Sequence, residues 1–366
     1  SWRLRYLYFL RELDLKNNLL TSLPPKIGRC DRLEKLVLSR NFIHKLPISI
    51  GRLSRLTALD ISENPIEYLP HEIGGMDNEE FQDMVGLRSI KVIKAKRCSS
   101  LLYLPSKLYR LTTLRELDLV ETSNLKTPPQ EILAQGFDVL FKYMYQQYVS
   151  ESALKWETVS FGLQRMPSSI FEMNKSLSES HGKDEGMPWL KEIDLSNNYI
   201  GTISRQITLL RDLRVLNLER NQISKVSKSL SYLTRLGRIN LSSNFLTTVG
   251  KEFGTLAALK FLSLDYNQIE FMDESCANLR SLMHLSLMSN MLKTFPEVII
   301  SLVNLQFLNL SSNQIGKIPN TIGRLQSLEI FLMQNNALDS IPESIGQLKS
   351  LQELDLSDNN IQLLPL

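Results

Sequence analysis

Residues 305–315 read LQFLNLSSNQI, and residues 10–20 read LRELDLKNNLL. Both stretches place apolar residues at their first, fourth, sixth and last positions, and an asparagine at the ninth. Steps of 23 residues connect this asparagine with its equivalents, first over Asn18, Asn41 and Asn64, and later over Asn198, Asn221, Asn244, Asn267, Asn290, Asn313, Asn336 and Asn359. A pattern that recurs at a fixed period predicts an array of similar structural units.

Each unit is predicted to hold one short strand and one turn. The L-x-L segment alternates with period two, as in a strand that buries one face. The asparagine follows the strand, where its amide can donate to and accept from backbone groups that lose water. A period of about 20–29 residues with this skeleton indicates an α/β leucine-rich-repeat solenoid. We expect a curved horseshoe with a parallel β-sheet on its concave face, because a single unit cannot bury its own leucines and must stack.

Three further units lack the asparagine and place Cys98, Thr122 and Phe161 at its position, which gives about 14 turns in two stacks. Two intervals are longer than the others, at residues 74–84 and 174–187. Both insertions are polar, and a solvated loop or short helix is the simplest interpretation. A projection that contacts a specific partner is the alternative.

The repeat stops at residues 126–148, KTPPQEILAQGFDVLFKYMYQQY. Two prolines lead into a predicted helix, at about 128–148, with one apolar stripe. The stripe consists of Leu133, Phe137, Leu140, Phe141, Met144 and Tyr148. Such a helix can cover the leucines of a last turn, and its position at the point where the repeat fails favours this role over that of a partner-binding amphipathic helix. We therefore expect a first stack over 1–148 that ends in a capping helix, and a second over 149–366 with an uncapped C-terminal end. Whether they form one continuous solenoid stays open.

This segment resembles the one that closes arrays in plain intracellular leucine-rich-repeat proteins and in LRR–Roc GTPases. The matching residues are Pro128, Pro129, Glu131, Ile132, Gly136, Leu140 and Tyr143. The 23-residue unit with L/I-P-x-x-I-G-x-L, as in IPNTIGRL (318–325), is similar to that of the Shoc/Ras-group proteins. The resemblance implies an intracellular scaffold without catalysis of its own.

Composition restricts the class of protein and its compartment. Of 366 residues, 43% are apolar and 22% are charged, as in soluble globular proteins. The net charge of +3 lacks the basic excess typical of nucleic-acid binders. The three cysteines are far apart, no apolar run could span a bilayer, and the N-terminus is a poor signal peptide. We predict an intracellular, cytoplasmic protein, with cytoskeletal or ciliary association left open.

The sequence carries no motif for catalysis, metal binding or cofactor binding. Its four histidines, His44, His71, His181 and His284, are not paired at metal-ligand spacing. Glycine-rich phosphate loops and nucleophile elbows are absent from the sequence. Carboxylates such as Asp60 and Asp118 recur because they share one strand position, which indicates a solvated face. We expect no enzyme activity, no cofactor and no metal.

The exposed strand positions lie six and four residues before the asparagine. They are mostly polar or charged in the first nine turns, and they become apolar in the next four. The predicted concave patch comprises Phe261, Tyr266, Met283, His284, Met288, Phe307, Ile330 and Leu332. An apolar patch with a polar rim is typical of a protein-binding site. Alternatively, Phe261 and Phe307 pack along the ladder with their neighbours.

A second, basic candidate lies in IKVIKAKRC (90–98), at Lys91, Lys94, Lys96 and Arg97. It could meet an acidic partner such as a tubulin tail or an anionic lipid, although such a run is often a solvated face. Together these features predict a non-enzymatic scaffold or adaptor that binds one or more proteins through its concave face. Two alternatives stay open: a fixed component of a cytoskeletal or axonemal assembly, and the recognition arm of a larger enzyme such as a Roc GTPase, kinase or ubiquitin ligase.

Overall fold

The computed structural model describes residues 9–76, 84–171, 190–362 and 364. The chain divides into two compact units, which are described separately below. The first comprises Ser1–Ser152 with Pro167–Ser169, and the second comprises Ala153–Met166 with Ile170–Leu366. Most of the insertion at 74–84, all of the insertion at 174–187, and His181 lie outside the described residues.

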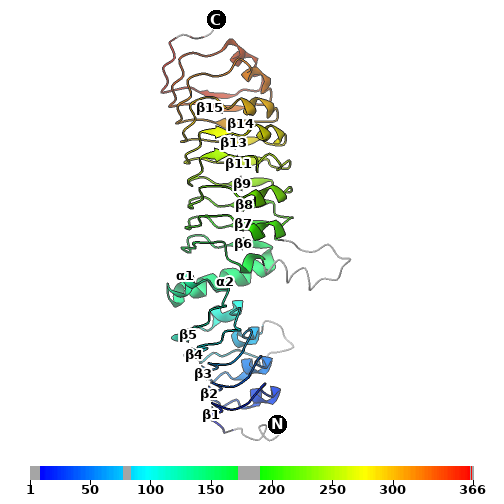
Figure 1. Cartoon of the computed structure of the whole chain (residues 1–366), viewed down its shortest axis with the longest axis vertical. Helices are drawn as coiled ribbons and strands as arrows, with labels where there is room; N and C mark the ends of the chain where they lie inside the picture. Colours follow the sequence, from blue (N-terminus) through cyan, green and yellow to red (C-terminus); the bar gives the residue numbers. More distant parts are fainter. Residues whose placement is uncertain (1–8, 77–83, 172–189, 363, 365–366) are drawn as a thin grey trace, which may run out of the picture. The chain divides into compact units, whose positions relative to one another are not determined.

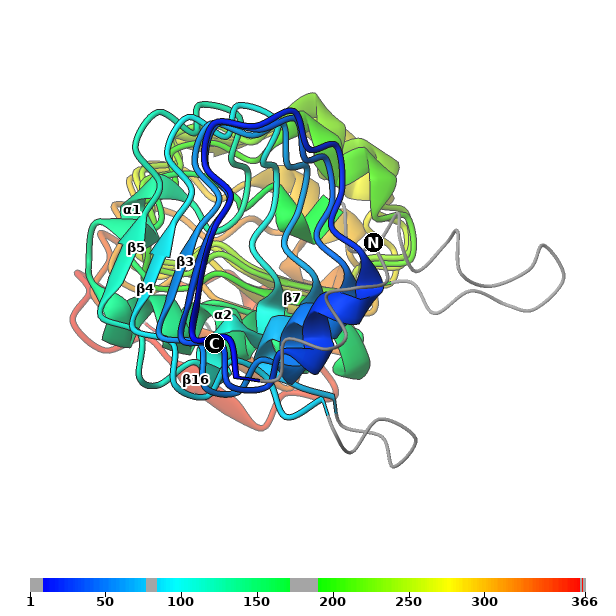
Figure 2. The ribbon, with the colours of Figure 1, turned by 90° about the horizontal axis from the view of Figure 1, so that it is seen from below.

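The first unit contains a five-stranded parallel sheet whose strands follow one another in chain order. The strands are β1 (Glu12–Asp14), β2 (Lys35–Val37), β3 (Ala58–Asp60), β4 (Val92–Lys94) and β5 (Glu116–Asp118). Short 3-10 helices connect them on the return side of the coil: η2 (Pro25–Arg29), η3 (Ile48–Arg52), η4 (His71–Gly74) and η6 (Ser106–Arg110). Figure 2 shows strands β3 to β5 side by side, with the blue 3-10 helices on the opposite side of the coil.

The helix predicted at about 128–148 is two helices, α1 (Gln130–Leu133) and α2 (Phe137–Ala153). The break falls at Gly136, whose φ of +90° does not fit an α-helix. Within the predicted stripe, Leu140 and Met144 are buried, whereas Phe137 and Phe141 are half-buried. The sequence did not show the break, because Gly136 falls inside an otherwise continuous helical pattern.

Helix α2 packs against the last 3-10 helix of the first unit through aromatic rings. The ring of Tyr109 in η6 lies 5.2 Å from that of Tyr145 and 5.5 Å from that of Tyr148. Tyr143 is buried, its hydroxyl lies 3.4 Å from that of Ser169, and burial raises its pKa to about 12. The helix leaves a hollow of about 670 Å³ beside β5, lined in part by Leu119, Leu133 and Phe137.

The second unit contains a nine-stranded parallel sheet, again in chain order (Figure 1), and also a two-stranded sheet. The nine strands are β6 (Lys155–Glu157), β7 (Glu192–Asp194), β8 (Val215–Asn217), β9 (Arg238–Asn240), β11 (Phe261–Ser263), β13 (His284–Ser286), β14 (Phe307–Asn309), β15 (Ile330–Leu332) and β16 (Glu353–Asp355). The smaller sheet pairs β10 (Thr248–Val249) with β12 (Phe271–Met272). The 3-10 helices are η7 (Arg205–Leu209), η8 (Lys228–Tyr232), η9 (Glu274–Asn278), η10 (Glu297–Ser301), η11 (Ile322–Arg324) and η12 (Glu343–Gln347).

The repeated asparagine makes hydrogen bonds to the backbone in every turn that carries it, and at most positions, such as Asn267, it makes four. The Nδ2 atom of Asn267 donates to the carbonyls of Leu264, Asp265 and, one turn earlier, Leu241, at 2.9–3.2 Å. Its Oδ1 atom accepts the backbone N–H of Leu246 at 2.9 Å. These bonds satisfy buried backbone groups and connect neighbouring turns.

Cys98 occupies the asparagine position in its turn, as predicted. Its Sγ atom lies 3.3 Å from the carbonyl oxygen of Ile61, one turn earlier. Asn64 donates to Leu38 in the equivalent way. A thiol makes fewer hydrogen bonds than an amide, so this turn carries the motif in a weaker form.

Candidate partner-binding surface

Four residues of the predicted concave patch lie in one ladder row of the nine-stranded sheet. They are on the face that points away from the leucine core, which we call the outer face. Parallel pairing aligns Phe261 with His284, His284 with Phe307, and Phe307 with Ile330. All four side chains are half-buried. The residues that follow them, such as Leu262 and Leu308, are fully buried. The strand register therefore separates an outer row from the leucine core.

The outer row is stacked ring on ring. The centroids of Phe261 and His284 are 4.2 Å apart with planes 11° apart, and those of His284 and Phe307 are 4.1 Å apart with planes 7° apart. The guanidinium carbon of Arg238 lies 4.4 Å from the centroid of Phe261. We call Arg238, Phe261, His284 and Phe307 the aromatic stack. Both faces of Phe261 and of His284 are thus covered, and a ligand would meet the ring edges.

His284 is held in its neutral form by this arrangement. Burial between the two phenyl rings, and then the positive charge of Arg238, lower its pKa to about 4. At neutral pH the imidazole therefore carries no charge, and it keeps one N–H donor and one acceptor nitrogen. Phe261 and Phe307 thus pack along the ladder with their neighbours, as the alternative interpretation of the sequence proposed. Their packing still leaves an apolar edge on the sheet face.

The other predicted patch residues lie around this stack and not in it. Leu332 is half-buried at the end of β15 and pairs with Asn309. Met283, which directly precedes β13, is 37% exposed. Tyr266 and Met288 lie beyond the strand ends, where Tyr266 adopts a φ of +55° and is 56% exposed. The eight predicted residues therefore form a central row with a looser surround.

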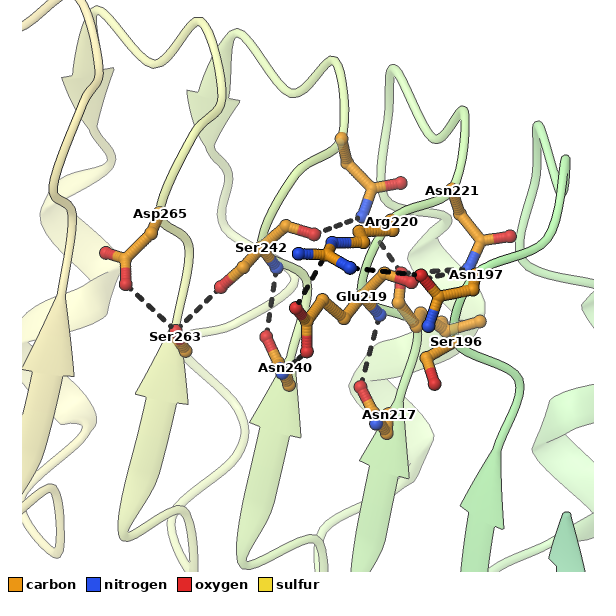
Figure 3. Close-up of polar contacts among 12 residues, drawn as sticks. Ser196, Asn197, Asn217, Glu219, Arg220, Asn221, Asn240, Ser242, Ser263 and Asp265 are labelled. Carbon is orange, nitrogen blue, oxygen red and sulfur yellow. Dashed lines mark hydrogen bonds and ion pairs between the residues drawn. The ribbon is translucent and has the colours of Figure 1, made fainter. Parts of the chain in front are cut away.

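A polar network runs along the ends of strands β7 to β13, and Figure 3 shows its part from Asn217 to Asp265. Asn217 donates to Asp194 at 3.0 Å, and Asn240 donates to Glu219 at 3.0 Å. The network continues through Ser242 and Ser263, whose hydroxyl oxygens are 2.7 Å apart, to Asp265. The Oδ1 atom of Asp265 accepts from the Ser286 hydroxyl and from the Met288 backbone N–H. Burial raises the pKa of Asp265.

A shallow hollow of about 270 Å³ lies on the same face, over strands β6 to β11. Its lining includes the charged and polar residues Lys155, Glu192, Asn217 and Arg238, and apolar residues such as Phe261. In the sequence, Arg238 looks like one more ordinary polar position. The signal that could have distinguished it is its alignment with Phe261 in neighbouring turns.

The basic candidate in the first unit is paired with carboxylates of the next turn. The Nζ atom of Lys96 lies 2.9 Å from Asp118, and the Nε atom of Arg97 lies 2.9 Å from Glu121. Lys94 lies 3.8 Å from Glu116. These contacts raise the pKa values of Lys96 and Arg97, because hydrogen bonds to the carboxylates favour the charged forms. Lys91, the fourth member, is exposed.

The reactive side chains lie in the core. Cys30, Cys98 and Cys276 are buried, and burial raises the pKa of each thiol, that of Cys276 to about 12. Thiolate chemistry is therefore disfavoured at these positions. Over residues 9–76, 84–171 and 190–362, no three His, Cys, Asp or Glu side chains are grouped as metal ligands. No helix in that part of the chain is long and apolar enough to cross a membrane.

Comparison with known proteins agrees with the geometry of the repeats. A leucine rich repeat family model matches residues 9–66, 211–269 and 270–315, and a second one matches residues 347–363. A solved leucine-rich-repeat protein of Leptospira interrogans is 29% identical, with a TM-score of 0.52, over 100% of this chain and 76% of that chain. The matched residues are leucine-rich repeats, and the chain has the leucine-rich-repeat fold. The predicted solenoid with parallel sheets is confirmed.

Two further solved structures are similar to this chain. An internalin from Listeria monocytogenes is 21% identical over 97% of this chain and 83% of that chain, with a TM-score of 0.45. The plant peptide hormone receptor RGFR1 in complex with RGF2 is 24% identical over 98% of this chain and 53% of that chain, with a TM-score of 0.48. None of the curated protein sequences compared with the chain matches it.

Proposed function

We propose that the chain is a non-enzymatic scaffold that binds another protein through the outer face of its nine-stranded sheet. The observation that carries this proposal is the aromatic stack. The ladder orders its rings, which are half-buried, and the apolar surface extends to Met283, which directly precedes His284, and to Ile330, which pairs with Phe307. Rigid aromatic anchors of this kind contribute most of the binding energy in many protein interfaces.

The finer assignments are also proposals. The L/I-P-x-x-I-G-x-L units support a Shoc/Ras-group scaffold of the cytoplasm, with a role in signalling or in a cytoskeletal complex. The contacts of Tyr109 with Tyr145 and Tyr148 support a capping role for α2 in a first stack over 1–148, with a second over 149–366. The basic cluster at Lys91–Arg97 is a weaker candidate surface, because neighbouring carboxylates offset most of its charge.

Quantitative affinity purification with mass spectrometry tests the proposal. We would compare the wild type with Phe261→Ala/Phe307→Ala, which removes two rings of the stack. Truncated hot-spot aromatics cost about 2 kcal/mol each or more, so a direct partner should bind more than about a hundredfold more weakly. Each protein lost would be purified, and its affinity for both forms measured by calorimetry.

The matched control replaces two exposed aromatics of the same unit, Tyr199→Ala and Phe245→Ala, which lie outside the patch. The control should retain every partner. If the stack variant folds normally and also retains every partner at unchanged affinity, the outer face of this sheet is not the interface.

A further inference from the structure

A row of cations runs along the strand starts beside the aromatic stack. Lys191, Arg214 and Lys260 directly precede β7, β8 and β11, and Arg238 is the first residue of β9. All four side chains are exposed. Within the described part of the chain, none of the four forms an ion pair with a carboxylate. We call these four residues the cationic row.

Backbone hydrogen bonds place these positions next to one another. Arg214 donates to Lys191 at 2.8 Å, Gly237 donates to Arg214 at 2.9 Å, and Lys260 donates to Gly237 at 2.9 Å. The next bond, from Met283 to Lys260 at 3.0 Å, continues the row into the apolar patch. Gly237 has no side chain, which leaves a gap in the row beside Arg238. The row thus changes from cationic at Lys260, which precedes β11, to apolar at Met283, which precedes β13.

Charge is distributed unequally across this face. The carboxylates of Asp194, Glu219 and Asp265 lie at or beyond the strand ends and accept hydrogen bonds from neighbouring side chains. Among the first residues of strands β6 to β11, the one with a carboxylate side chain is Glu192. Over β7 to β11 the strand starts therefore carry more positive than negative charge, and anionic groups of a ligand are favoured there.

The aromatic stack also favours negatively charged groups of a ligand. Because Arg238, His284 and Phe307 cover the faces of the inner rings, a ligand meets ring edges. The edge of an aromatic ring is the positive part of its quadrupole. It therefore favours carboxylate and carbonyl oxygens, or the face of another aromatic ring in a T-shaped contact.

We propose that this surface binds an extended acidic segment of a partner protein in which the acidic residues adjoin apolar ones. The segment crosses the strands, with carboxylates on the cationic row and apolar side chains on Phe261, Met283 and Phe307. The distance from β7 to β14 is five strand spacings of about 4.8 Å, or about 24 Å, which about seven extended residues span. This inference rests on the proposed function and specifies the chemistry of the partner.

A synthetic peptide tests the inference by fluorescence anisotropy. The probe is a fluorescein-labelled peptide of four glutamates followed by Phe-Leu-Phe, titrated with the full chain. We expect Arg214→Glu/Lys260→Glu to weaken binding at least tenfold, and 0.3 M salt to weaken wild-type binding by screening. A peptide with serines in place of Phe-Leu-Phe, and one with lysines in place of the glutamates, should each bind at least tenfold more weakly.

The matched control is Lys251→Glu/Lys293→Glu, which changes the net charge equally at exposed lysines away from the cationic row. It should bind the probe within about twofold of the wild type, and all variants should keep the wild-type melting temperature. The inference is overturned if the probe does not bind, or if the control weakens binding as strongly as the row variant. It is also overturned if a single-stranded oligonucleotide of equal charge binds as tightly as the probe, because the surface would then be a general polyanion site.

Failure of this inference can be separated from failure of the proposed function. If Phe261→Ala/Phe307→Ala loses a cellular partner while Arg214→Glu/Lys260→Glu retains it, the scaffold function stands and the acidic-segment inference is wrong. If both variants retain every partner, the proposed function itself is wrong.

Discussion

The imidazole ring of His284 lies parallel to the phenyl ring of Phe307, with centroids 4.1 Å apart and planes 7° apart. Protonation would place a positive charge between two phenyl rings and close to the guanidinium of Arg238. The neutral imidazole is therefore the form that fits the stack. It acts as a flat spacer that keeps Phe261 and Phe307 in line on the sheet face.

The first prediction concerns the titration of His284. Its pKa in the folded protein is lowered to about 4, against about 6.5 in the unfolded chain. Between these two pKa values the unfolded state binds more protons than the folded state. The contribution of His284 to the free energy of unfolding is therefore fully present above about pH 6.5, and it is lost as the pH decreases toward 4. A shift of this size corresponds to about 3 kcal/mol, which we discount to about 1 kcal/mol because the side chain is half-exposed and solvent-screened.

Urea unfolding at pH 7 and pH 5 measures this effect, with His284→Phe as the comparison. The wild type should lose about 1 kcal/mol more than the variant between the two pH values, since the variant keeps the stack without the titration. NMR titration of the imidazole gives the pKa directly. A value near 6.5 would contradict a buried, neutral spacer.

The second prediction concerns the asparagine ladder. Asn267→Leu removes hydrogen bonds to Leu241, Leu246, Leu264 and Asp265, and it leaves those buried backbone groups without that partner. We expect a loss of about 1–3 kcal/mol in the free energy of unfolding, measured by thermal melting. Gln268→Leu, at the exposed position next to it, should change the melting temperature little. An unchanged melting temperature for Asn267→Leu would show that the ladder is not stabilising.

Much of this architecture can be predicted from the sequence, because the same residue pattern recurs in each repeat. The 23-residue step fixes which residues share a ladder row, so the sequence alone aligns Phe261, His284 and Phe307. The step does not fix ring orientation, and the flat stack and the guanidinium of Arg238 over Phe261 depend on rotamers set by neighbouring turns. The sequence-based prediction missed the cationic row, because three of its members precede the two exposed strand positions that define the predicted patch.

Two other features of the structure could not be predicted from the sequence pattern. Lys96 meets Asp118 across an interval that differs from the regular step, so charge counting along the sequence showed an excess where the structure has a pair. The break at Gly136 needs a positive φ, which hydrophobic periodicity does not report. The local sequence pattern therefore predicts the ladder rows and the buried core residues well, and it predicts ion pairs and helix breaks poorly.

The third prediction concerns helix α2. Leu140→Asp/Met144→Asp places two carboxylates at buried positions, where neither is compensated. Limited proteolysis should then cut near residues 110–150, while residues 190–360 stay resistant. Lys142→Asp, at an exposed position of the same helix, should leave the cleavage pattern unchanged. Uniform resistance of the double variant would contradict the capping role proposed for α2.

The last prediction separates the outer row from the core. Phe261 and Phe307 lie on the outer face, so Phe261→Ala/Phe307→Ala loses ring stacking, worth about 0.5–1.5 kcal/mol for each aromatic pair, and should still fold. Leu262 and Leu308 are fully buried, and Leu262→Ala/Leu308→Ala leaves cavities that cost about 2–5 kcal/mol each. Denaturant unfolding of the two variants side by side measures both effects. The inner pair should lose several times more stability than the outer pair. The reverse order would mean that the outer row supports the fold more than the leucine core does, and loss of a partner in the outer variant would then report unfolding instead of a binding surface.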